Sequence, residues 1–137
     1  MKRILVAIFV LAATACGAAA SGPPLQQWLA QTNGFIKDQQ VAIHGMKLHQ
    51  SRACSLPTSV ERRAACNAGY DAVVALRYAI IAQFQLRLTA VQLDPASQNF
   101  ILTDIAPPQE MDRMRNSVND EWLKVWRMFP DPTYKPK

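Results

Sequence analysis

The sequence lacks the short motifs by which common enzyme classes are recognised. It contains no G-x-S-x-G nucleophile turn, no H-E-x-x-H zinc helix and no glycine-rich phosphate loop. The adjacent acids Asp120 and Glu121 diverge on a helix, so they do not form a facing pair of catalytic carboxylates. Nothing in the sequence calls for a cofactor. We therefore expect a protein that is not an enzyme and that needs no cofactor.

Patterns typical of β-structure are missing as well. No stretch sustains the alternation of apolar and polar residues that marks a strand, and there is no internal repeat. The dipeptide Asn33-Gly34 lies between helical stretches and does not join two strands. The sequence therefore predicts an all-α fold, a small bundle of three main helices plus one short helix.

The N-terminus has the pattern of an export signal. Lys2 and Arg3 precede twelve residues without formal charge, ending at Ala15. This run is shorter than the roughly 20 residues of a membrane-spanning helix. We expect residues 1–20 to be a cleaved signal and the mature protein to reside in the bacterial periplasm.

Two cleavage sites are compatible with this signal. Ala13-Thr14-Ala15-Cys16 resembles the lipobox of bacterial lipoproteins, although that family usually has Leu where Ala13 stands. The resemblance implies cleavage before Cys16, lipidation of that cysteine and an anchor in the outer membrane, since Gly17 is not a familiar inner-membrane retention residue. The alternative is cleavage after Ala20, which leaves a soluble periplasmic protein.

Charge of one sign is not concentrated anywhere in the chain. Loss of Lys2 and Arg3 with the signal reduces 15 basic side chains to 13, against 10 acidic ones, a net charge of +3. The cations are scattered, so no patch favours nucleic acid. We expect no nucleic-acid partner.

Cysteine is scarce, and the export signal determines how it is interpreted. Once Cys16 is removed or lipidated, Cys54 and Cys66 remain as an even pair in an oxidising compartment. The sequence predicts one intramolecular disulfide between them. A reactive thiol assisted by His49 is the alternative, but no C-x-x-C motif and no orienting residue support it.

Prolines divide the mature chain into helical segments. The first main helix is expected from about residue 24 to 50, and the second from about 59 to 92 after a capping-box sequence that starts at Thr58. A short helix should run through residues 100–102, and the third main helix should end near 129. Residues 21–129 thus form the helical domain, and we expect the proline-rich tail 130–137 to be extended and mobile.

Apolar residues at helical spacing predict which faces form the core. The second helix is unusual because the side opposite its core face consists largely of alanine. We expect it to be the central helix, buried on two sides; the alternative is that the alanine face meets another protein. The predicted faces are Leu25, Trp28, Leu29, Thr32, Ile36, Ile43 and Met46 in the first helix; Cys66, Tyr70, Val73, Ile80, Phe84, Leu88 and Val91 in the second, opposite Ala68, Ala72, Ala75, Ala79, Ala82 and Leu86; and Met111, Met114, Val118, Trp122, Val125 and Phe129 in the last.

Arg77 is a candidate site because it lies within the apolar face of the second helix. A buried guanidinium needs partners, so we expect Arg77 to pair with Glu121 or Asp38, or to extend to the edge of the core. If instead it is exposed within an apolar cleft, it becomes a candidate for binding an anion or a partner protein.

Four further residues are candidates for partner binding. Trp122 and Trp126 lie on one side of the last helix, where core packing is the simple interpretation and a partner hot spot the functional one. Arg62 and Arg63 lie in a charged cluster beside the predicted disulfide, either as a solvated face or as a site for an acidic partner.

Two alternatives from other functional classes remain. His44, Met46 and His49 are of the ligand types that copper prefers, but the two histidines point about 140° apart on a continuous helix.

Leu88-Thr89-Ala90-Val91-Gln92 resembles the L-T-x-x-Q pattern of the Spy and CpxP periplasmic chaperones, in which the threonine opens a helix. A periplasmic copper carrier and a Spy-like chaperone are therefore the alternatives to our main expectation. That expectation is a non-catalytic module that binds another protein of the cell envelope, such as an inhibitor or immunity protein or an accessory subunit of an envelope or secretion machine.

Overall fold

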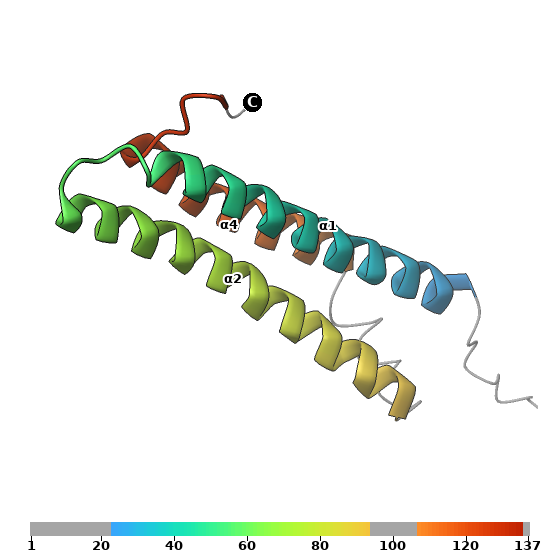
Figure 1. The fold of residues 1–137 in the computed structure, drawn as a ribbon. Helices are drawn as coiled ribbons and strands as arrows, with labels where there is room; N and C mark the ends of the chain where they lie inside the picture. The colour runs from blue at the N-terminus through green and yellow to red at the C-terminus, as the bar shows by residue number, and fades with distance from the viewer. Residues whose placement is uncertain (1–22, 94–106, 136–137) are drawn as a thin grey trace, which may run out of the picture.

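The structure is a bundle of three long helices. The computed structural model describes residues 23–93 and 107–135. Its helices are α1 (Pro23–Ala53), α2 (Val60–Leu93) and α4 (Pro107–Met128). They pack side by side, with α2 antiparallel to the other two, and the α1–α2 turn lies at the same end of the bundle as the end of α4 (Figure 1). The described ranges contain no strand, so the predicted all-α fold is confirmed.

Three predictions fall outside the described residues: the export signal 1–20, the lipidation site Cys16 and the short helix through 100–102. Among the residues that are described, no helix is both long enough and apolar enough to cross a membrane.

The helix boundaries agree with the sequence prediction to within about three residues. Helix α1 continues through Asn33-Gly34 without a break, because Phe35 and Ile36, which follow directly, are both held in the core. Helix α2 begins one residue later than expected. The Ser59 hydroxyl accepts the backbone N–H of Arg62 at 3.1 Å, so Ser59 rather than Thr58 caps the helix.

The predicted apolar faces of the three helices form the core. Tyr70 and Phe84 of α2 are completely buried, and the Phe84 ring meets Phe35 of α1 edge to face with centroids 5.0 Å apart. Gly69 allows α4 to approach α2 closely, since a Cβ at this position would lie 3.2 Å from a methyl carbon of Val125. The main core joins the apolar face of α4, from Met111 to Val125, and the following Phe129 to the apolar faces of α1 and α2.

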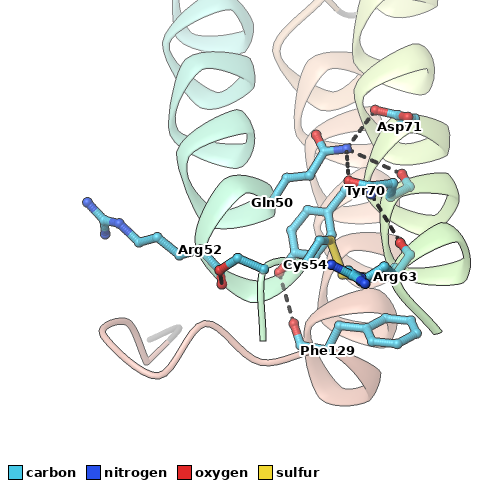
Figure 2. The surroundings of a disulfide bond; sticks show 10 residues. Gln50, Arg52, Cys54, Arg63, Tyr70, Asp71 and Phe129 are labelled. Carbon is cyan, nitrogen blue, oxygen red and sulfur yellow. Dashed lines mark hydrogen bonds between the residues drawn. A yellow bond between two sulfur atoms is a disulfide. The ribbon is translucent and has the colours of Figure 1, made fainter. Parts of the chain in front are cut away.

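The predicted disulfide joins Cys54, just after α1, to Cys66 in the second turn of α2. Both cysteines are buried, with their Cα atoms 5.5 Å apart. Beside the bond, the Gln50 side-chain amide donates to the carboxylate of Asp71 at 2.9 Å and to the side chain of Asn67 at 3.2 Å (Figure 2). The covalent bond and these polar contacts hold the α1–α2 turn in place.

The prediction that α2 is buried on two sides is wrong. Each helix of the bundle contacts both others, so one broad face of each is enough to form the core. The opposite side of α2 has no neighbouring helix among the described residues, and its alanines face solvent: Ala68, Ala72, Ala75, Ala79 and Ala82 are all exposed, as is Leu86.

Over residues 130–135 the tail does not run extended as predicted. These residues are not helical, as the prolines require. However, they fold back in a turn closed by the Tyr134 N–H and the Asp131 carbonyl at 3.2 Å, and Asp131 is 1 % exposed. Side-chain contacts to α1 therefore fix this segment to the end of the bundle.

Candidate functional site

Arg77 is buried, and its bonding partners are neutral. It is 3 % exposed and donates to the side-chain oxygens of Gln39 at 2.6 Å and Asn119 at 2.8 Å, and to the sulfur of Met46 at 3.1 Å. These partners come from α1 and α4, so one side chain of α2 ties the three helices together. Burial lowers the pKa of Arg77.

The predicted carboxylate partners of Arg77 are wrong. Glu121 pairs with Lys124 on its own helix, and Asp38 is an exposed residue beside a different hollow. Among the described residues no carboxylate lies within ion-pair distance of Arg77, and its side chain does not extend to solvent. The guanidinium is therefore a buried cation balanced only by amide and thioether groups.

A cavity of about 240 Å³ lies beside this cation. Three rings stand around it: His49 and Tyr134 have centroids 4.3 Å apart, and the Trp122 centroid lies 5.7 Å from that of Tyr134. The indole N–H of Trp122 is buried without a hydrogen-bond partner in the described part of the chain. We call this space the Arg77 cavity; it is lined by Ala42, Gly45, Met46, His49, Arg77, Asn119, Trp122 and Tyr134.

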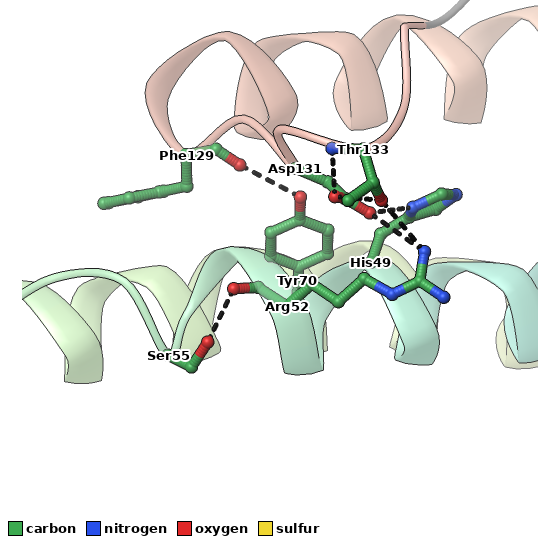
Figure 3. A network of polar contacts seen from close by, with 7 residues as sticks. All are labelled: His49, Arg52, Ser55, Tyr70, Phe129, Asp131 and Thr133. Atoms are coloured by element: carbon green, nitrogen blue, oxygen red, sulfur yellow. Dashed lines mark hydrogen bonds and ion pairs between the residues drawn. The ribbon is translucent and has the colours of Figure 1, made fainter.

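A network of polar contacts holds the tail that closes one side of the cavity. Asp131 bonds the Nδ1 atom of His49 at 2.7 Å and accepts the backbone N–H and the hydroxyl of Thr133 at 2.9 and 2.7 Å (Figure 3). Arg52 donates to the Thr133 hydroxyl at 3.0 Å, and the buried Tyr70 hydroxyl donates to the carbonyl of Phe129 at 3.0 Å. Arg52 also forms an ion pair with the Asp131 carboxylate, with nitrogen and oxygen 3.7 Å apart. We call the contacts of Asp131 with His49, Arg52 and Thr133 the tail clasp.

The electrostatics of the tail clasp favour an ionised carboxylate. Burial alone raises the pKa of Asp131, but the hydrogen bonds from His49 and Thr133 outweigh it and lower the pKa to about 2. Because this carboxylate only accepts, the His49 Nδ1 atom is the donor. Burial, together with the nearby negative charge of Asp131, raises the pKa of Tyr70 to about 12.

We expect acid to weaken the tail clasp. A carboxylate whose pKa falls from 3.8 to about 2 on folding contributes stability that is complete above about pH 4 and is lost as the pH falls through 2. Asp131→Asn should therefore be less stable than the wild type at about pH 6, and the difference should shrink between about pH 4 and pH 2. Urea unfolding of both proteins across this range measures the difference; a constant gap would contradict an ionised clasp.

The structure does not bring the proposed copper ligands together. Helix α1 is continuous, and His44 faces solvent. The sulfur of Met46 accepts from Arg77, and His49 is bonded to Asp131. Two of the three candidate ligands are thus engaged with other groups.

The remaining candidate residues lie apart from the Arg77 cavity. Trp126 is half-buried and its indole N–H has no partner among the described groups. Arg62 and Arg63 are exposed in the first turn of α2. Arg63 lies close to the disulfide (Figure 2), and Arg62 borders a separate shallow hollow. Thr89 of the chaperone-like pattern lies inside α2 and donates to the carbonyl of Gln85, so it does not open a helix.

The outward side of α2 is a second candidate site. Nine exposed residues on it are spaced alternately by three and four positions, the spacing of a seam between two helices. No charged side chain is exposed on α2 from residue 72 to 93: Arg77 is buried, and Arg87 is held by both oxygens of Glu110. We call this surface the α2 outer face; it comprises Ala65, Ala68, Ala72, Ala75, Ala79, Ala82, Leu86, Thr89 and Leu93.

No protein-family model, curated protein or solved structure matches this chain. Its function must therefore be inferred from its own side chains and surfaces.

Proposed function

We propose that this protein is a non-catalytic binding module of the bacterial cell envelope and that the α2 outer face holds another protein. The observation that supports this is an exposed face, made of alanine and leucine apart from Thr89, that carries no charge from residue 72 to 93. Soluble domains rarely leave a long apolar surface uncovered unless it binds something. Leu86 and Leu93, which are 71 % and 80 % exposed, are the largest apolar side chains on this face.

The chemistry of the face indicates a helix as its partner. Alternate spacings of three and four keep a row of side chains on one line along a helix, against which a second helix can pack. Alanine at most of these positions lets two helix axes approach to about 8 Å. The face extends from Ala65 to Leu93, about 42 Å at 1.5 Å per residue. We infer that the partner presents a long helix with an uncharged, apolar side.

The expected export signal and lipid anchor at Cys16 support an envelope location. A tethered bundle would hold the α2 outer face at the membrane surface, where it can reach an envelope protein. An inhibitor or immunity protein and an accessory subunit of an envelope or secretion machine both fit this arrangement.

Site-specific cross-linking tests the proposed surface. A photoreactive residue replacing Ala75 or Ala82 should give one discrete adduct in the producing cell. The same residue at Asn116, an exposed position on α4, should not. Mass spectrometry of the adduct should locate the cross-link on a helix with an uncharged apolar side. Leu86→Glu should abolish the adduct, because it places a charge in the seam.

Three outcomes would overturn the proposal. An adduct between two copies of this chain would assign the face to a homodimer. Many unrelated adducts would favour the chaperone alternative over a single partner. Equal yields of cross-linked adduct at Ala75 and Asn116 would show that the α2 outer face has no special role.

The Leu86→Glu variant should remain folded. Its melting temperature should be nearly unchanged, since substitutions at such exposed positions usually alter stability by less than about 0.5 kcal/mol.

A further inference from the structure

We propose that the Arg77 cavity binds a carboxylate attached to an aromatic ring. This site is separate from the α2 outer face, because α2 contributes to the cavity only the buried Arg77, and the rest of the lining comes from α1, α4 and the tail. Three features carry the proposal: an unneutralised buried cation, a second free donor and a ring-lined space of limited size.

The first feature is the charge of Arg77. A guanidinium carries five N–H donors, and the described residues accept three of them, all with neutral acceptors. A buried cation without an anion is costly, and a guanidinium can bind a carboxylate through two parallel hydrogen bonds. The two remaining donors and the missing negative charge therefore match one carboxylate group.

The second feature is the indole N–H of Trp122. This donor belongs to a residue that lines the cavity, and it is buried with no partner in the described chain. A buried N–H donor normally has a hydrogen-bond partner. A ligand oxygen that reaches both Arg77 and Trp122 would satisfy the donor and neutralise the cation together.

The third feature is the size and lining of the space. About 240 Å³ is below the roughly 300–1,000 Å³ of pockets for drug-sized ligands, so the ligand is small. The rings of His49, Trp122 and Tyr134 lie within 6.1 Å of one another, centroid to centroid. Such rings favour stacking or edge contacts with another ring. A single aromatic ring bearing a carboxylate fits both the volume and the walls.

Gly45 provides a way to block the cavity without disturbing the fold. Ala42, Gly45 and His49 are spaced by three and four residues, so they share the side of α1 that lines the cavity. A Cβ at Gly45 meets no atom within 4 Å. Leucine also has a higher helix propensity than glycine. Gly45→Leu should therefore fold and occupy the space that the ligand needs.

Phenylacetate is the probe for the first experiment. Added to the full-length protein, it should shift the NMR signal of the Trp122 indole N–H, assigned with Trp122→Phe, but not those of Trp28 and Trp126. Phenylacetamide, which lacks the negative charge, should bind at least about tenfold more weakly than phenylacetate. Arg77→Met and Gly45→Leu should both abolish the shift.

Gly34→Leu is the matched control, because Gly34 is a second glycine of α1 with equally open space around its Cβ and it lines a different hollow. This variant should bind like the wild type. A tripeptide ending in phenylalanine, tested with a free and with an amidated C-terminus, distinguishes a free acid from a peptide carboxylate as the source.

Equal binding of acid and amide, or a Gly45→Leu protein that binds normally, would overturn the proposal. So would the absence of any shift with phenylacetate and with the free peptide. Cross-linking at the α2 outer face is expected to persist in Gly45→Leu, so failure of one proposal does not affect the other.

Discussion

Replacement of Phe84 by alanine is expected to lower the free energy of unfolding by about 4 kcal/mol. Phe84 is completely buried, its ring meets Phe35, and the Arg87 guanidinium lies 5.1 Å from its centroid. Truncation removes these contacts and leaves a cavity that three packed helices cannot fill by collapse. Urea unfolding followed by circular dichroism measures the change.

Leu86→Ala is the control for this prediction. Leu86 lies two residues further along the same helix but is 71 % exposed on the α2 outer face, so its truncation should change stability by less than about 0.5 kcal/mol. The pair also tests which side of α2 is buried. Similar losses for Phe84→Ala and Leu86→Ala would mean that both sides are covered in the isolated protein, contrary to the structure.

Local sequence signals predicted most of the architecture. Along α4 and the residue that follows it, apolar residues from Met111 to Phe129 recur at spacings of three and four, and the whole row packs in the main core. The start of α2 was marked by Pro57 and by a hydroxyl residue able to cap a helix. Such features depend on neighbours within a few residues, so they can be interpreted without knowledge of the tertiary structure.

Whether the alanine-rich side of α2 is buried or exposed could not be predicted from such local signals. Alanine has the same helix propensity whether or not a second helix covers it, and its small side chain is found both inside and outside proteins. Whether Ala75 is buried depends on how many helices surround α2, which is a property of the whole bundle. The alanine-rich side of α2 can be recognised in the sequence. Its exposure follows from the arrangement of α1 and α4, which both pack on the other side of α2.

The candidate site was predicted in part. The position of Arg77 within the apolar face marked it as unusual, and in the structure it is buried beside a cavity rather than exposed in a cleft. Its partners Gln39 and Asn119 carry no sequence signal, because they depend on the rotation and register of α1 and α4. The contact between His49 and Asp131, 82 residues apart, is equally non-local. Prolines 130 and 132 predicted a non-helical tail, but not a tail held by a buried carboxylate.

Removal of the disulfide by the double substitution Cys54→Ser and Cys66→Ser is expected to cost about 3 kcal/mol. The bond closes a short loop, with a sequence separation of 12, and its main effect is to restrict the unfolded chain. For a domain of this size such a loss corresponds to a melting temperature roughly 15 °C lower. Thermal unfolding of the oxidised wild type and the double variant measures the difference, and reduction of the wild type should reproduce the variant's curve.

Because the stabilisation arises mainly in the unfolded chain, the folded structure should change little when the bond is lost. The α1–α2 turn retains the contacts of Gln50 with Asn67 and Asp71, and Arg77 still bridges α1 and α4. The Trp122 indole signal of the double variant should therefore match that of the wild type below the unfolding transition. A shifted Trp122 signal would mean that the disulfide also positions the helices around the Arg77 cavity, and an unchanged melting temperature would mean that it does not restrict the unfolded chain.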